Sequence, residues 1–167
     1  MPNTDNPNGF RPWGAVLSIK KFEKDSSAAR VFRWDVIEIE ADGGVIAAAA
    51  GQTALVGTAA AGSAASTADD LMVYDDPDQK FEAQDDADGA TSAQTNAGNM
   101  ADHLATTGST TTGISAHEID ISSAGTSAAG FLLLDLVNRP GNAWGVNADI
   151  VVNINEHLRG QIGRAGI

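Results

Sequence analysis

The stretch "DDLMVYDDPDQKFEAQDDADG", Asp69 to Gly89, contains two short alternating apolar segments among nine acidic residues and a single basic one. Alternation is typical of a half-buried strand, and a proline with an aspartate on each side, between the two segments, marks a turn. We therefore expect a β-hairpin with strands at 71–74 and 80–84 and a solvated turn between them. The side chains expected to face the core are Leu71, Val73 and Phe81.

The same strand signals recur on both sides of this stretch. On its N-terminal side, "VFRWDVIEIEADGGVIAAAA" changes register near Val36 and Ile37, which indicates a bulge, before a hairpin turn at Asp42–Gly44. Glycines recur every five or six residues in the alanine-rich segment that follows, which favours short strands over a helix. Further strands are expected at 15–22, 45–49, 54–59, within 114–122, at 130–138 and within 147–158, and the one candidate helix lies at 95–104.

Together these elements predict an all-β fold. We expect a small antiparallel β-barrel or β-sandwich of about eight short strands, with at most one short helix. The domain should span 14–158, after an extended N-terminal arm at 1–13 and before a flexible or partner-bound C-terminal tail at 159–167. Prolines and an Asn-Gly turn keep the arm out of a helix. Its aromatic residues, Phe10 and Trp13, should dock either onto the domain itself or onto another molecule.

Composition excludes several functions. The absence of cysteine excludes disulfides and thiol chemistry. The net charge of -12 argues against nucleic acid as a partner, because phosphate contacts require Lys and Arg. No apolar run approaches the roughly 18 residues of a membrane helix and no signal peptide is visible, so we expect a protein made in a cytoplasm without a membrane partner.

The charge is unevenly placed along the chain. Residues 1–33 hold six basic side chains against three acidic ones, whereas residues 34–158 hold two basic against 19 acidic. The last nine residues add two more arginines. Two interpretations stay open: the pattern serves solubility, or the basic ends lie on an acidic partner surface.

Residue patterns typical of catalysis are absent from the sequence. Asp86 and Asp88 resemble part of a calcium-binding loop, but the acidic residue required at its twelfth position is missing. A weak calcium site is the lesser alternative to aspartates that shape a turn. Glu118 and Asp120 share one face of a strand, opposite His117, as in an ordinary solvated face. We therefore expect no enzymatic activity, no cofactor and no metal site.

The order of motifs is more informative than any single one. An "NPNGFRP" arm comes first, "VYDDPDQKFEAQ" lies in the middle, and "GSTTTGIS" precedes a closing segment with "NRPGNAW". This order resembles the small head-decoration, or cement, proteins of tailed bacteriophages, in which an arm precedes a β-barrel. The resemblance covers nearly the whole chain. The charged residues 14–30 and the C-terminal extension depart from it.

The resemblance implies a structural virion protein, made in the host cytoplasm, that binds the outer surface of the capsid. Such proteins hold neighbouring capsomers together against internal DNA pressure, and the implied partners are the major capsid protein and further copies of the chain in a homotrimer. An arm with large aromatic anchors and basic side chains suits such a contact. The candidate capsid-binding residues are Phe10, Arg11, Pro12 and Trp13, with Lys20, Lys21 and Lys24 as electrostatic contacts.

A carbohydrate- or cell-surface-binding module is the alternative function. Trp144 lies close in sequence to Asn142 and Asn147, and an exposed aromatic ring beside free amide groups is typical of a sugar platform. The competing interpretation has Trp144 as a buried anchor of the last strand pair. Exposure of its ring separates the two hypotheses.

Overall fold

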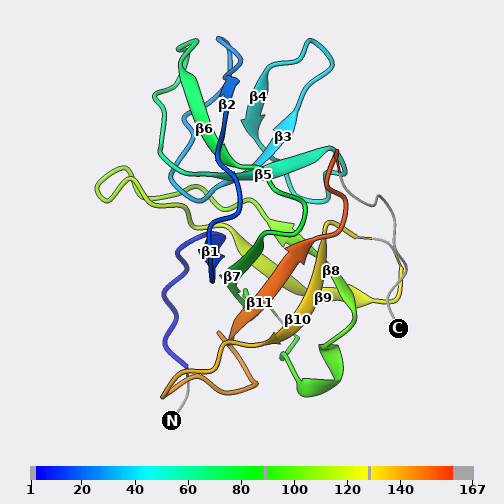
Figure 1. Ribbon diagram of the computed structural model, residues 1–167. Helices are drawn as coiled ribbons and strands as arrows, with labels where there is room; N and C mark the ends of the chain where they lie inside the picture. Colours follow the sequence, from blue (N-terminus) through cyan, green and yellow to red (C-terminus); the bar gives the residue numbers. More distant parts are fainter. Residues whose placement is uncertain (1–2, 89, 128, 160–167) are drawn as a thin grey trace.

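Two antiparallel sheets contain the strands of the computed structural model, which describes residues 3–88, 90–127 and 129–159 (Figure 1). The first sheet consists of β1 (Arg11–Trp13), β7 (Lys80–Gln84), β8 (Met100–Leu104), β9 (Glu118–Gly125), β10 (Phe131–Leu136) and β11 (Asp149–Ile154). The second consists of β2 (Lys20–Glu23), β3 (Val36–Ile39), β4 (Val45–Ala47), β5 (Leu55–Ala59) and β6 (Asp70–Tyr74). Their spatial orders are β1–β7–β11–β10–β8–β9 and β2–β6–β5–β3–β4.

Each sheet curls until strands from distant positions meet. In the six-stranded sheet, Asp85, directly after β7, forms a parallel bridge with Ile119 of β9. In the five-stranded sheet, Lys24, directly after β2, forms a parallel bridge with Val45 of β4. These bridges bring the far side of each sheet back toward its beginning, so that each encloses apolar side chains of its own.

The apolar core accordingly has two parts. The larger cluster lies within the six-stranded sheet and includes Phe81, Phe131 and Ile150, but it also receives Val36 and Leu55 from the other sheet. The smaller cluster lies within the five-stranded sheet. Because residues of both sheets share the larger cluster, the two sheets pack as one body, one above the other in Figure 1.

The expected all-β class and the antiparallel pairing are confirmed, but the described residues form eleven strands rather than about eight. One unexpected strand is β1, inside the arm. Another is β8, where 95–104 was expected to be a helix; only Gln94–Asn96 forms a single 3₁₀ turn. The helix prediction is wrong because β8 pairs with both β9 and β10, and this tertiary pairing outweighs local helix propensity.

The predicted hairpin at 71–84 is also wrong in its pairing, although both strands exist. β6 pairs with β2 and β5, and β7 pairs with β1 and β11, so the acidic turn carries the chain from one sheet to the other. Leu71, Val73 and Phe81 are buried, as predicted. Alternation identified the buried face, but it does not specify the neighbouring strand.

The bulge in β3 is confirmed close to its expected position. The register of β3 against β5 shifts between Ile37 and Glu38. Opposite this shift, Gly57 has φ +144°, and a Cβ atom there would lie 2.0 Å from the Tyr74 carbonyl oxygen. The close approach of β5 to β6 therefore requires glycine at this position.

The strand expected at 15–22 is mostly absent. Only Lys20–Glu23 forms β2, and residues 14–19 connect the two sheets, beginning with a bend at 14–15. Within the described parts of the chain, no helix is long and apolar enough to cross a membrane.

Candidate interaction surface

Phe10 belongs to the core of its own domain. Its side chain has no exposed surface, and its ring stacks on Phe131 with the centroids 4.5 Å apart. The backbone N–H of Phe10 donates a hydrogen bond to the Trp34 carbonyl oxygen over 3.0 Å. In this conformation the ring is not available to a partner, and the arm docks onto its own domain at this point.

Arg11 and Pro12 lie on β1, at the edge of the six-stranded sheet. The Arg11 guanidinium pairs with Glu82, which also pairs with Arg139. Much of the Arg11 charge is therefore used within the fold. Pro12 has no N–H and sits opposite Phe81. The edge therefore lacks a donor that an added strand would need.

Trp13 and two of the candidate lysines are exposed, whereas the third lysine is not. Trp13 has 37% of its surface exposed. The Lys20 ammonium lies 5.4 Å from the centre of the Phe22 ring, and the Lys21 ammonium pairs with Asp70 over 3.0 Å at the surface. Lys24 is buried, and its ammonium donates to the main-chain oxygen of Asp25. Burial thus leaves Lys24 little surface to offer a partner.

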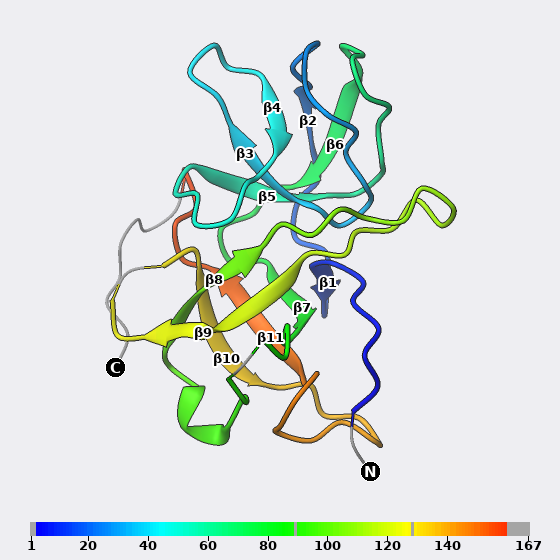
Figure 2. The ribbon, with the colours of Figure 1, turned by 180° about the vertical axis from the view of Figure 1, so that it is seen from behind.

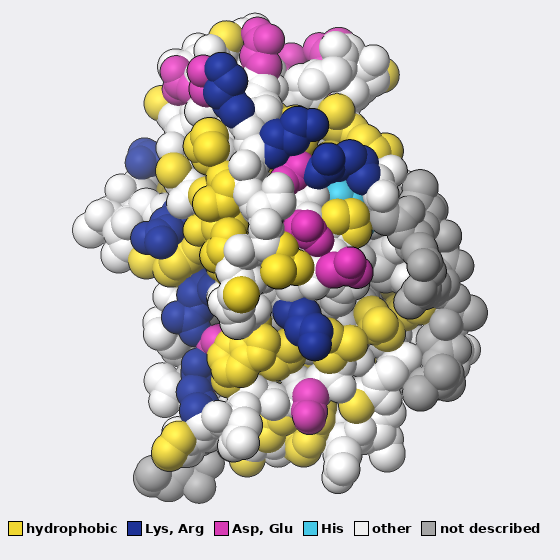
Figure 3. Space-filling view, viewed as in Figure 1, with side chains coloured by type: hydrophobic (Ala, Val, Ile, Leu, Met, Phe, Trp, Pro, Cys, Tyr) yellow, Lys and Arg dark blue, Asp and Glu magenta, His cyan; other side chains and the backbone are white. Residues whose placement is uncertain are grey.

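The connection between β1 and β2 exposes aliphatic side chains that the sequence prediction placed in a half-buried strand. Val16, Leu17 and Ile19 expose 49%, 52% and 45% of their surface, and we refer to these three residues as the apolar ridge. Hydrophobic side chains form a band down the middle of the face in Figure 3, with basic side chains beside it. Exposed aliphatic residues this close together make this segment a candidate contact surface.

Two fully buried polar side chains hold the apolar ridge from beneath. The Leu17 N–H donates to Oε1 of Gln79 over 3.0 Å, and the Ser18 hydroxyl donates to Oδ1 of Asp75 over 2.8 Å. Asp75 is also paired with Arg159. Because buried hydrogen-bonding groups fix the backbone, the ridge is held in place rather than loosely tethered. The two hydrogen bonds join residues that are 62 and 57 positions apart in the sequence, so no local sequence signal predicts them.

A cleft of about 480 Å³ opens where the two sheets meet, between the 29–35 loop, the end of β4 and the 105–110 loop. We call it the junction cleft. Its walls are mainly apolar, and its lining includes three buried ionisable residues, Asp35, Glu38 and His117. An apolar cleft with a few polar groups is the usual form of a binding site in a protein of this size.

The imidazole of His117 is already occupied by the fold. Its Nδ1 accepts a hydrogen bond from the Val36 N–H over 3.2 Å, so the neutral ring carries its proton on Nε2, which lies 3.4 Å from Oδ1 of Asp35. Burial raises the pKa of Asp35 to about 6. Burial, with a smaller contribution from His103, lowers the pKa of His117 to about 3. With Nδ1 used by the backbone and the pKa of the ring lowered by burial, His117 is a weak base.

The polar face predicted for β9 is more buried than expected. Glu118 has its pKa raised to about 7, mainly by burial and then by the negative charges of Asp5, Asp86 and Asp85. Asp5 belongs to the arm, so the arm and the acidic loop converge beside β9. Asp86 thus lies in a repulsive acidic group.

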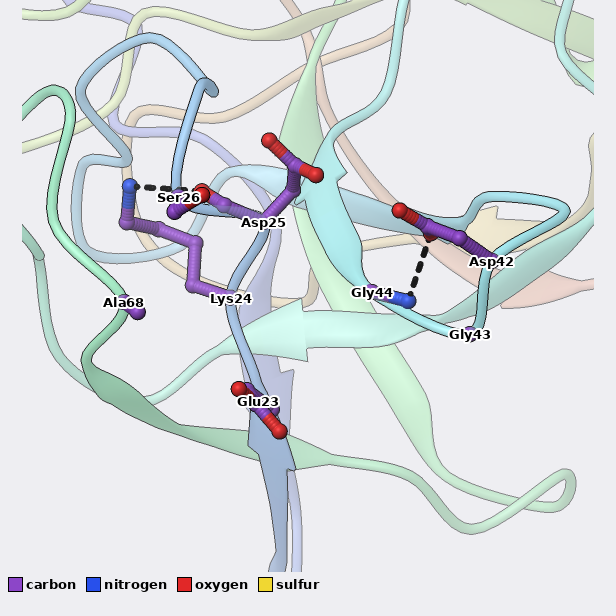
Figure 4. Close-up of a pocket in the computed structure, with 8 residues that line it drawn as sticks. All are labelled: Glu23, Lys24, Asp25, Ser26, Asp42, Gly43, Gly44 and Ala68. Atoms are coloured by element: carbon purple, nitrogen blue, oxygen red, sulfur yellow. Dashed lines mark hydrogen bonds between the residues drawn. The ribbon is translucent and has the colours of Figure 1, made fainter.

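The carboxylates that come close enough for one cation are not those suggested by the sequence. Among the described residues, Asp25, Glu40 and Asp42 bring ligand atoms within 4.8 Å of one another. Figure 4 shows Asp25 and Asp42 beside a shallow hollow near the buried Lys24. Each already accepts protein hydrogen bonds, from Ser27 and Gly44 respectively. An exposed acidic group of this kind does not by itself define a metal site.

The residues of the predicted sugar platform serve the fold. Trp144 is half-buried and packs against the larger core cluster. The Asn142 amide donates to the carbonyl oxygens of Val137 and Asp149 and accepts from the Asp149 N–H. Since this amide is fully used, Asn142 does not offer a free amide group beside the Trp144 ring.

No family model, curated protein or solved structure matches this chain. The resemblance to phage decoration proteins therefore rests on the sequence motifs alone.

Proposed function

We propose that the protein is a structural virion component that binds the outer surface of a tailed-bacteriophage capsid and cements neighbouring capsomers. The observation that carries the proposal is the segment 13–21, which exposes apolar and basic side chains and is fixed from beneath by Gln79 and Asp75. A surface of this composition, fixed before binding, loses little conformational entropy on contact.

The contact residues are narrower than the set expected from sequence. Trp13, Lys20 and Lys21 are the exposed members, and they suit a partner surface with an apolar patch and acidic side chains. Arg11 and Pro12 contribute through β1, which presents Trp13. Phe10 and Lys24 support the segment from inside the domain. The major capsid protein as partner, the assembly of three copies and the outer virion surface as location are parts of this proposal.

Many weak contacts are sufficient for this role. A lattice presents the same surface at many positions, and simultaneous contacts multiply modest affinities. A compact β-domain supplies a stiff body between such contacts.

The test is co-sedimentation with empty, expanded phage heads that lack the protein. We expect saturable binding of the wild type, weakened at least tenfold by Trp13→Ala combined with Lys20→Glu, and weakened further by added salt, which screens surface charges. Val146→Asp, at an exposed apolar position on another loop, is the matched control and should bind normally. Failure of the folded wild type to bind heads saturably would refute the proposal.

A further inference from the structure

The apolar ridge and the junction cleft lie on opposite faces of the molecule. β1 and β2, which flank the ridge, lie toward the viewer in Figure 1, whereas β3, β4 and β8, which border the cleft, lie toward the viewer in Figure 2. A single copy therefore cannot place its own ridge in its own cleft. Two copies side by side in the same orientation can bring a ridge and a cleft together.

The two surfaces match in their apolar character. The ridge offers three branched aliphatic side chains fixed in place, and the cleft offers about 480 Å³ between apolar walls. The walls include Phe32, Ile46, Ala47, Ala49 and Ala105. Removing both surfaces from water would supply the hydrophobic free energy that neither gains in an isolated copy.

Charge also matches across the two surfaces. The ridge is followed directly by Lys20 and Lys21, both exposed. The cleft contains the carboxyl groups of Asp35 and Glu38, against one guanidinium, that of Arg30, which rests over the Phe32 ring. A ridge that approaches the cleft of a second copy therefore brings positive charge toward the carboxyl groups of that cleft. This attraction favours a contact between unlike surfaces, ridge to cleft.

We propose that the apolar ridge of one copy docks into the junction cleft of a second copy of this chain. The contact is heterologous, because different surfaces of the two copies meet, so it generates a closed ring or an open row. It rests on the assembly of several copies that the proposed function includes, and it deepens that part by naming the surfaces that meet; it does not depend on capsid binding itself. On a lattice, it would join neighbouring copies along the surface.

The experiment uses two variants that each remove one half of the contact. Leu17→Asp brings a carboxylate toward the acidic cleft and disables the ridge, whereas Thr107→Arg fills the cleft from an exposed lining position. Val146→Asp and Thr111→Arg are matched controls, exposed and outside both surfaces. Light scattering measures the molar mass at protein concentrations up to about 1 mM, which is the effective concentration that a short linkage produces. Circular dichroism confirms that each variant is folded.

We expect the wild type and both controls to form species larger than one chain, and each disabled variant to remain a single chain. An equimolar mixture of the two disabled variants should form a species of two chains and nothing larger. In that mixture one intact ridge meets one intact cleft, and no second contact remains.

Three outcomes would overturn the inference: a wild type that stays a single chain, oligomers that survive both substitutions, or disabled variants that do not combine. The outcome is independent of head binding. If the chains associate as expected but do not bind phage heads, capsid binding is refuted while the contact between copies stands. If the chains bind heads but do not associate, the contact is refuted while capsid binding stands.

Discussion

His117 and Asp35 face each other with 3.4 Å between Nε2 and Oδ1, and only 4% and 2% of their side chains are exposed. Burial raises the pKa of Asp35 and lowers that of His117, so the two groups change the stability in opposite directions as the pH changes. The pKa of Asp35 is raised, so its contribution to stability is complete below about pH 3.8 and is lost as the pH rises through about 6. The pKa of His117 is lowered, so its contribution is complete above about pH 6.5 and is lost as the pH falls toward about 3.

Asp35→Asn should therefore make stability more sensitive to acid. In the wild type, proton uptake by Asp35 between about pH 6 and 4 offsets part of the penalty of keeping His117 neutral. Removing that uptake should steepen the dependence of unfolding free energy on pH by up to about 1.4 kcal/mol per pH unit. Chemical denaturation at half-unit intervals from pH 4 to 7 measures the slope, with the exposed Asp78→Asn as control. Parallel curves for Asp35→Asn and the wild type would contradict the prediction.

Glu118→Gln should stabilise the protein at high pH. The raised pKa of Glu118 means that its stabilising contribution is lost as the pH rises through about 7, when a half-buried carboxylate must ionise near Asp5, Asp86 and Asp85. Allowing for solvent screening, we expect a gain of about 1 kcal/mol at pH 8.5. Little gain should appear at pH 4.5, where the carboxyl group is protonated in the folded protein. Thermal melts at the two pH values suffice, and an equal gain at both would point to a cause other than charge.

Phe10→Ala and Trp13→Ala should separate folding from binding. Phe10 is fully buried and stacked on Phe131, so its truncation should cost about 3–5 kcal/mol of unfolding free energy. Trp13 is substantially exposed, and its truncation should cost less than about 1 kcal/mol. Urea denaturation measures both values. If the Trp13 variant is destabilised as much as the Phe10 variant, the division between core residue and contact residue is wrong.

Gln79→Ala should loosen the apolar ridge. The Gln79 side chain accepts a hydrogen bond from the Leu17 N–H and donates one to the Lys80 carbonyl oxygen over 2.8 Å. Neither bond involves the aliphatic side chains of the ridge. We expect a loss of about 1–3 kcal/mol, because two partly buried hydrogen bonds are removed. Amide hydrogen exchange at Leu17 should accelerate by more than the change in global stability explains. Unchanged relative protection at Leu17 would show that the ridge is held by other contacts.

The sequence allowed the fold class to be predicted because its strongest signals are local. Alternation placed Leu71, Val73 and Phe81 in the core, and the Asp42–Gly44 turn joins β3 to β4 as expected. The partner of each strand was less accessible. β6 and β7 are separated by a short turn, yet β6 pairs with β2 and β5 whereas β7 pairs with β1 and β11, because the turn carries the chain from one sheet to the other.

The candidate surface was located only in part, for the same physical reason. Exposed Trp13, Lys20 and Lys21 were named from residue type, but the ridge was assigned to a strand at 15–22 because its side chains alternate weakly. Its support comes from Gln79 and Asp75, and the cleft joins Asp35 to His117 across 82 positions. Such contacts between distant segments depend on the assembled fold, and no motif or period in the sequence reports them.

The bridges at Lys24–Val45 and Asp85–Ile119, together with Pro12 on the outer edge of β1, have a further consequence. Proteins crowded on a surface risk fibril growth when an open strand recruits the next chain through its backbone. In the contact that we propose, neighbouring chains would meet mainly through side chains, whose shapes and charges specify one geometry. Dense packing of copies can therefore remain ordered and reversible, without passing into a cross-β aggregate.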